Sequence, residues 1–148
     1  MLERLEITGF AVARSVVIEL GPGLTVFTGE TGAGKSLVAD ALAFVFGARR
    51  GREVIATGAE RATVRATVAL PGGRKVIERS IALSGRTTAK VDDVLATVDD
   101  LRELAAGLVD IHGQSEQLAI LRPQVQLAVL DEFAGLGPQR EAVASTVR

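Results

Sequence analysis

The eight residues GETGAGKS, Gly29 to Ser36, constrain the fold of this chain more than any other stretch. They fit the pattern G-x-x-x-x-G-K-[ST] without a mismatch. The apolar run Leu24 to Phe27 before them predicts a strand, and KSLVADALAFVF after them predicts a buried helix that ends at Gly47. Glycines at three of the eight positions let consecutive backbone N–H groups turn toward one anion. The stretch therefore predicts a phosphate-binding loop between a strand and a helix.

The chemistry of a phosphate loop gives the polar groups of this stretch distinct roles. The helix that starts near Lys35 directs its positive end at the bound anion, and the Lys35 ammonium adds a mobile cation for the β- and γ-phosphates. The Ser36 hydroxyl is placed to ligate Mg²⁺. A glycine-rich turn that matches by chance is disfavoured by the flanking strand and helix. With a nucleoside triphosphate and Mg²⁺ as the expected ligands, the predicted phosphate site consists of Gly29, Glu30, Thr31, Gly32, Ala33, Gly34, Lys35 and Ser36.

Alternating apolar residues predict further strands on both sides of this loop. Residues 49–61 are polar and rich in glycine, and we expect a loop there. Thr97 and Asp100 stand three residues apart, which is an acidic variant of the capping box, before a helical pattern that extends to Val109. The expected strands are RLEITGF (4–10), SVVIEL (15–20), and a meander of ATVRATVAL (62–70), KVIERSIAL (75–83) and TTAKV (87–91).

Composition excludes several classes of protein. The chain has no Cys and a single His112, so disulfide frameworks, thiol chemistry and a zinc site built on histidines are excluded. No stretch approaches the roughly 20 apolar residues that span a bilayer, and we expect a cytoplasmic protein with no membrane partner. A net charge of −1 does not indicate a globally basic nucleic-acid binder. The tightest basic cluster, Arg49, Arg50 and Arg52, fits a solvated loop or a contact with phosphate or a partner lobe.

Three stretches of the chain resemble one family. LERLEITGFAVARSVVIELGPGLTVFTGETGAGKS, SGRTTAKVDDVLATVDDLRELAAGLVDIHGQSEQ and ILRPQVQLAVLDEFAG resemble SMC-like ATPases, most closely the RecN-like family of bacterial DNA repair proteins. The last two stretches are narrower signals than the phosphate loop, which many families share. The resemblance implies an α/β fold, the N-terminal lobe of an ABC/SMC-type P-loop NTPase head with an antiparallel β-meander subdomain, over residues 1–121. Residues 122–148 would form a helix that leads into a truncated coiled coil.

The resemblance also implies a function and partners. RecN-like proteins act in the recombinational repair of DNA double-strand breaks, and the expected location is the cytoplasm, at the nucleoid. The expected partners are ATP, the C-terminal lobe of the same protein, a second head in a homodimer, and DNA. That C-terminal lobe would bring the signature motif and the catalytic carboxylate. This chain by itself would therefore bind ATP weakly and hydrolyse little.

The resemblance assigns one more site residue outside the phosphate loop. Gln114 in HGQSEQ matches the family's Q-loop glutamine, which contacts Mg²⁺ or the attacking water, whereas without the family it would be taken for a surface residue on a turn. Lys35 and Gln114 are thus the expected catalytic residues, and Ser36 and Gln114 the expected metal ligands. Ser115 stands where many relatives have His, so we expect His112 to be structural. Arg14 follows the first strand, where a solvated loop arginine is favoured over one that approaches nucleotide.

The stretch QLAVLDEFAG raises a rival interpretation, because an apolar strand that ends in Asp-Glu supplies the metal ligand and base of many ATPases. A compact P-loop NTPase or an ABC transporter subunit would use Asp131 and Glu132 in this way. We favour a helix instead, since Pro123 suits a first helical turn and no family signature precedes the stretch; ALSGR at 82–86 is expected to be a turn. A nucleotide-gated interaction module without hydrolysis is the other alternative that stays open.

Overall fold

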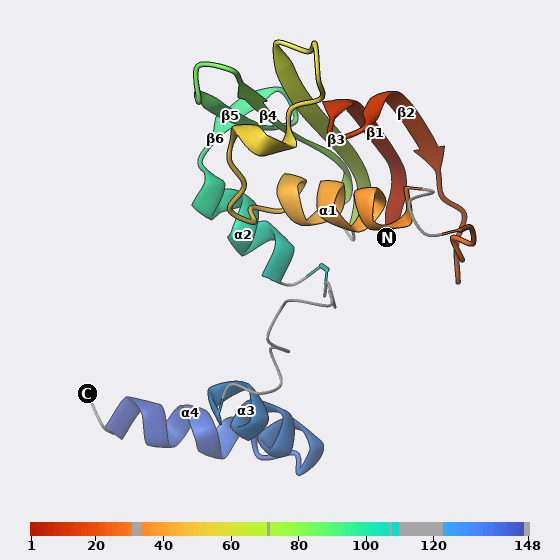
Figure 1. The fold of residues 1–148 in the computed structure, drawn as a ribbon. Coiled ribbons are helices and arrows are strands. Elements are labelled where there is room, and N and C mark those ends of the chain that lie inside the picture. Colours follow the sequence, from red (N-terminus) through yellow and green to blue (C-terminus); the bar gives the residue numbers. More distant parts are fainter. Residues whose placement is uncertain (31–33, 71, 107, 110–122, 147–148) are drawn as a thin grey trace. The chain divides into compact units, whose positions relative to one another are not determined.

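The computed structural model describes residues 1–30, 34–70, 72–106, 108–109 and 123–146 (Figure 1). Its contacts divide the chain into two compact units, Met1–Ile111 and His112–Arg148. Gln114 and His112, and Thr31 to Ala33 of the predicted phosphate loop, lie outside the described residues.

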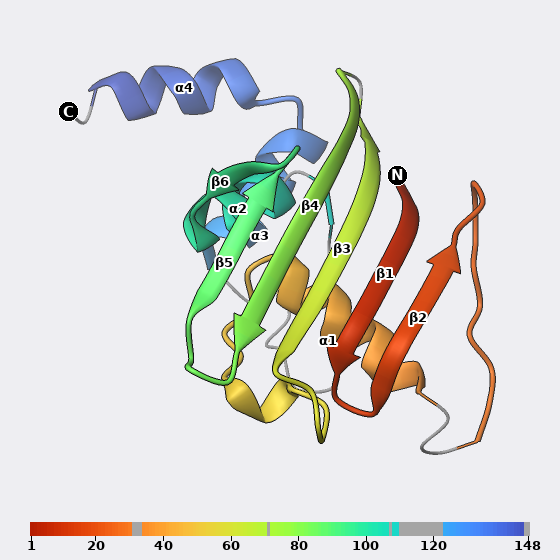
Figure 2. The ribbon, with the colours of Figure 1, turned by 90° about the horizontal axis from the view of Figure 1, so that it is seen from above.

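One antiparallel sheet of six strands forms the frame of the first unit. Figure 2 shows the strands in the order β2-β1-β3-β4-β5-β6, in which β1 lies between β2 and β3. Successive strands are joined by short turns except between β2 and β3, where the chain leaves the sheet to form the phosphate loop and the helix that follows it. The strands are β1 (Leu2–Phe10), β2 (Ala13–Glu19), β3 (Arg61–Leu70), β4 (Gly73–Ala82), β5 (Thr87–Val91) and β6 (Val94–Ala96).

The alternation seen in the sequence decides which face of the sheet is buried. On β3, Val64 and Val68 are buried, whereas Arg65 lies on the opposite face and pairs with Glu78 of β4 at 3.0 Å. The five strands predicted from alternation are confirmed, although β4 starts at Gly73, two residues earlier than expected. Strand β6 was not expected, because three residues carry too little pattern to reveal a strand.

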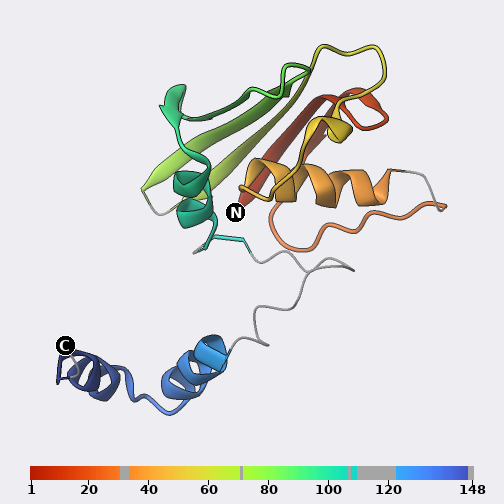
Figure 3. The same cartoon turned by 60° about the vertical axis from the view of Figure 1, so that its left-hand side comes forward.

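Helix α1 (Lys35–Val45) covers the buried face of the sheet, as Figures 1 and 3 show from two sides. Its apolar residues explain this placement, since Phe44 and Val45 are fully buried and the Phe44 ring lies 5.5 Å from that of Phe10 on β1. Gly47 follows the helix with φ 100°, which confirms the predicted C-terminal glycine.

Two arginines hold the carboxyl end of α1. Buried Arg79 of β4 donates two hydrogen bonds of 2.7 Å, to the carbonyl oxygens of Phe44 and Ala48. Arg102 of helix α2 (Val98–Ala106) donates from Nε to the Gly47 carbonyl at 3.0 Å. Cations at this end suit the partial negative charge of the last carbonyls. Together they fix α1 against the sheet and against α2.

The predicted capping box at the start of α2 is confirmed. The Asp100 carboxylate accepts a hydrogen bond from the Thr97 N–H at 2.7 Å, and the Thr97 hydroxyl accepts one from the Asp100 N–H at 3.1 Å. The first of these bonds holds the pKa of Asp100 below its ordinary value, because a donor to the carboxylate favours the charged form.

The predicted strand over Leu24 to Phe27 is wrong for this structure. No backbone hydrogen bond among the described residues involves residues 24–28. A β-strand needs a hydrogen-bonding neighbour on at least one side, and in the described structure this segment has none. Its apolar side chains are consequently exposed, Leu24 by 90% and Val26 by 67%.

Another correction concerns the expected loop at 49–61. It contains a 3₁₀ turn, Arg52–Val54, that buries Val54 in the core, and residue 61 already belongs to β3. Nothing in the polar composition of this stretch marks the turn, because its single buried apolar residue gives no periodicity.

The second unit consists of helix α3 (Pro123–Phe133) and helix α4 (Gly137–Thr146). The prediction that QLAVLDEF is helical is confirmed, with Pro123 at its first position. The single helix expected to lead out of the domain is interrupted, because Gly135 adopts φ 67° and ends α3 in a left-handed turn. Asp131 and Glu132 therefore lie on a helix and not at the end of a strand.

Candidate phosphate-binding site

The amino end of α1 carries the predicted phosphate site. Gly34 is the residue before the helix, with φ 90° and ψ 4°, a left-handed conformation that favours glycine. No side chain of the described residues caps the helix, and the first intrahelical hydrogen bond at this end runs from the Val38 N–H to the Gly34 carbonyl at 3.3 Å. The N–H groups of the first turn are thus available for an anion, and the helix dipole favours one there.

Lys35 and Ser36 supply side-chain groups at the same end. The Lys35 ammonium donates to the carbonyl of Glu30 at 2.8 Å and to the carbonyl of Gly29, so it is folded back over the loop that precedes the helix. Both side chains are exposed and lie one after the other in the first turn. These donors, an ammonium, a hydroxyl and main-chain N–H groups, fit a polyphosphate together with a hard cation such as Mg²⁺.

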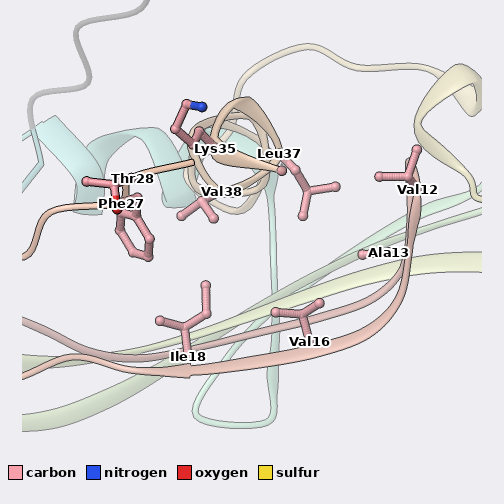
Figure 4. A pocket seen from close by; sticks show the side chains of 10 residues that line it. Val12, Ala13, Val16, Ile18, Phe27, Thr28, Lys35, Leu37 and Val38 are labelled. Carbon is pink, nitrogen blue, oxygen red and sulfur yellow. The ribbon is translucent and has the colours of Figure 1, made fainter. Parts of the chain in front are cut away.

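A cavity of about 450 Å³ lies beside this helix end, between α1 and the inner face of β2 (Figure 4). Its walls are mostly apolar, and Figure 4 shows the Lys35 ammonium pointing away from them. Apart from Gly34 and Lys35, sequence reasoning did not name the residues that line this cavity as site residues, although the alternation of Val16 and Ile18 already places both on one face. The cavity is lined by Val12, Ala13, Val16, Ile18, Phe27, Thr28, Gly34, Lys35, Leu37 and Val38.

The arginines considered from the sequence lie elsewhere. Arg14 is exposed on β2, within a strand and not in a loop, and it does not line this cavity, whereas its neighbour Ala13 does. Arg50 pairs with Asp40 at 3.1 Å, and Arg52 donates to the Leu83 carbonyl at 3.4 Å. Arg49 and its two neighbours therefore do not form one group of unpaired charges.

Comparison with known proteins identifies the family of this chain. A family described as an AAA domain matches residues 4–126, which is most of the chain and includes the whole phosphate loop. The chain belongs to this AAA domain family. As an AAA domain it has a P-loop NTPase fold, which confirms the predicted fold class.

Among curated proteins, this chain is similar to the DNA repair protein RecN of Xylella fastidiosa. The two are 40% identical over 97% of this chain, and the chain spans 28% of the length of that relative. The resemblance to RecN-like proteins seen in the sequence is thereby confirmed.

Solved structures show the same fold. An SMC head bound to the C-winged helix domain of ScpA is 27% identical and superposes with a TM-score of 0.67 over 79% of this chain and 43% of that one. A structure from a study of the ATP-driven dimerization and DNA-stimulated activation of SMC ATPases has the same TM-score at 24% identity, over 89% of this chain and 98% of that one. The latter likeness shows the fold alone. Among the described residues, no helix is long and apolar enough to cross a membrane.

Proposed function

We propose that this chain is the ATP-binding N-terminal lobe of an SMC-like ATPase head that acts in the recombinational repair of DNA double-strand breaks. The observation that carries the proposal is the uncapped amino end of α1, with Gly34 in a left-handed conformation and Lys35 and Ser36 in the first turn. The similarity to RecN supports the biological context. The intact protein would then work at the nucleoid in the cytoplasm.

The residues of this lobe would divide the binding of ATP among them. The backbone N–H groups of Gly29 to Ser36 and the Lys35 ammonium would hold the phosphate oxygens and neutralise their charge. Ser36, together with Gln114, would hold Mg²⁺, which supplies further neutralisation of the phosphates. To bind nucleotide, the Lys35 ammonium would have to leave the carbonyls of Gly29 and Glu30, to which it donates hydrogen bonds.

The exposed segment Leu24–Phe27 supports the need for a C-terminal lobe of the same protein. Its residues favour a strand, and Leu24 and Val26 each gain about 1.5–3 kcal/mol when fully buried. A strand from the remaining part of the protein would satisfy both the backbone groups and the side chains. ATP would then close two such heads into a homodimer that acts on DNA, and hydrolysis would open it.

The helical conformation of α3 weighs against the compact NTPase as an alternative. That mechanism needs Asp131 and Glu132 at the end of a strand next to the phosphate loop, and they lie instead on a helix of the second unit. Hydrolysis by this chain by itself is therefore expected to be slight.

ATP binding by the chain, measured by isothermal calorimetry with Mg²⁺, tests the proposal. Lys35→Ala removes a charged hydrogen-bond donor worth about 1.5–3 kcal/mol, and we expect the affinity to fall roughly 10- to 100-fold. Lys90→Ala, which removes a lysine from strand β5 outside the site, is the matched control and should bind as the wild type does. Equal affinities of Lys35→Ala and the wild type would show that the phosphate loop does not hold the nucleotide.

Turnover by the same chain tests the need for the second lobe. Phosphate release from ATP should stay near the background rate, and Glu132→Gln should leave it unchanged. Substantial turnover that Glu132→Gln abolishes would instead establish the compact NTPase.

A further inference from the structure

A second cleft, of about 280 Å³, lies where β1 ends and β2 begins. It shares no lining residue with the cavity beside α1. Arg14 reaches it from β2 and Arg61 from the start of β3. The turn of residues 56–59 and the end of β1 complete it. We call it the arginine cleft, and it is lined by Thr8, Gly9, Arg14, Ala56, Thr57, Gly58, Ala59 and Arg61.

The two guanidinium groups of the arginine cleft are not neutralised by the described part of the protein. Two other arginines of the same sheet are paired with carboxylates: Arg4 with Glu6 at 2.9 Å, and Arg74 with Glu3 at 2.7 Å. Neither Arg14 nor Arg61 forms an ion pair with any described residue, and Arg61 donates only to the Ser80 hydroxyl at 3.3 Å. Two positive charges therefore converge on one small depression.

The backbone beside these arginines adds further donors. The turn is tied down by hydrogen bonds of 2.9 Å from the Ala56 N–H to the Gly9 carbonyl and from the Ala59 N–H to the Ala56 carbonyl. Between them, the N–H groups of Thr57 and Gly58 have no hydrogen-bond acceptor among the described residues. With φ 82°, Gly58 adopts a left-handed conformation of the kind that makes anion-binding concavities from successive N–H groups.

Gly9 makes this close arrangement possible. A Cβ at Gly9 would lie 2.4 Å from the Arg61 carbonyl oxygen, so only glycine lets β1 approach the start of β3 this closely. Gly9 also has φ 60°, in the left-handed region. The distance between β1 and the start of β3, which carries Arg61, is thus set by the backbone.

We propose that the arginine cleft binds a phosphate group of a nucleic-acid backbone. Guanidinium forks, hydroxyls and N–H groups are the donors that phosphate oxygens accept from. The cleft is smaller than the roughly 300–1,000 Å³ of small-molecule pockets, and none of its lining residues is aromatic, so it fits one phosphate and offers no platform for a base. The ligand is therefore a phosphodiester that lies along the surface. The proposal does not depend on nucleotide binding at Lys35.

Amide resonances of Thr57 and Gly58 report on the cleft directly. In ¹H–¹⁵N spectra of the full chain, inorganic phosphate and, separately, a short DNA duplex should shift both resonances. The double variant Arg14→Gln/Arg61→Gln should lose these shifts, and Lys35→Ala should retain them. Shifts that survive in the double variant, or that never occur with either ligand, would overturn the proposal.

Salt dependence of duplex binding separates a backbone ligand from free phosphate. By fluorescence anisotropy, the double variant should bind a labelled duplex more weakly, with the slope of log K against log salt reduced by about 0.9 for the one phosphate contact that is lost. The control Arg86→Gln/Arg140→Gln removes the same charge from exposed positions elsewhere and should retain the wild-type slope. If the salt slope falls by the same amount in both double variants, the duplex is held by the overall charge of the protein and not by the arginine cleft. If inorganic phosphate alone shifts the resonances, the assignment to a nucleic-acid backbone is refuted.

Discussion

Replacement of Arg79 by methionine should destabilise the first unit by about 2–4 kcal/mol. Arg79 donates two charged hydrogen bonds of 2.7 Å to the end of α1 and stacks 4.4 Å above the Phe44 ring. Each such bond contributes about 1.5–3 kcal/mol and the stacked cation about 1–2 kcal/mol. In Arg79→Met the Ala48 carbonyl would lose the hydrogen bond from Arg79. The Phe44 carbonyl would still accept a hydrogen bond from the Gly47 N–H at 3.1 Å.

Two opposing effects limit that loss. The Nε of Arg79 is buried without a hydrogen-bond partner among the described residues, which costs about 1–3 kcal/mol that methionine would recover. Burial, and then the charge of Arg102, lower the pKa of Arg79, which shows that the folded protein holds this cation at a cost. Methionine has a similar length and no charge, so it removes both effects together with the hydrogen bonds.

Urea unfolding followed by far-UV circular dichroism measures the difference, since the chain has no Trp or Tyr for fluorescence. A loss of 2–4 kcal/mol should lower the midpoint by roughly 1–2 M. Arg79→Lys keeps the charge but not the planar fork and should fall between the wild type and Arg79→Met. Arg86→Met, at an exposed position, should change stability by less than about 0.5 kcal/mol. If Arg79→Met is as stable as the wild type, the cost of the buried cation outweighs its bonds and our reasoning about the end of α1 is refuted.

Two further changes test the packing and the electrostatics of the same unit. Gly47→Ala should cost about 1–3 kcal/mol, because φ is 100° there and the new Cβ would lie 2.6 Å from Arg102 Cγ; an unchanged urea midpoint would contradict this. The pKa of Asp92 is lowered, first by the hydrogen bond from the Val76 N–H and then by Lys75, so its contribution to stability is complete above the ordinary pKa of 3.8 and is lost as pH falls through the lower folded value. Asp92→Asn should therefore reduce the loss of stability between pH 5 and pH 2, and identical pH profiles of the two proteins would count against a role for this carboxylate.

Local pattern was sufficient for much of the fold. Strands β3 and β4 were predicted because they are adjacent in the sequence, alternate cleanly and are joined by a short turn. The same kind of pattern gave a wrong prediction for the run from Leu24 to Phe27. Its residues favour a strand, but the pattern cannot tell whether a partner strand is present. In α3 and α4 the helices were expected from Pro123 and from the family resemblance, yet the interruption at Gly135 was missed, since one glycine can either be tolerated in a helix or end it.

Whether the sequence could predict a candidate site depended on how far apart the residues of that site lie along the chain. The sequence by itself was enough to predict the phosphate loop, because all of its expected donors lie within eight consecutive residues and the helix that follows starts at Lys35. It also pointed to the cluster of Arg49, Arg50 and Arg52, where the tertiary structure engages Arg50 with Asp40 and Arg52 with a carbonyl. Only the pairing of β1 with both β2 and β3 brings Arg14 and Arg61 to one cleft. Only the packing of β4 on α1 sets Arg79 at the helix end, because contacts between distant segments depend on strand order, which no local pattern of side chains encodes.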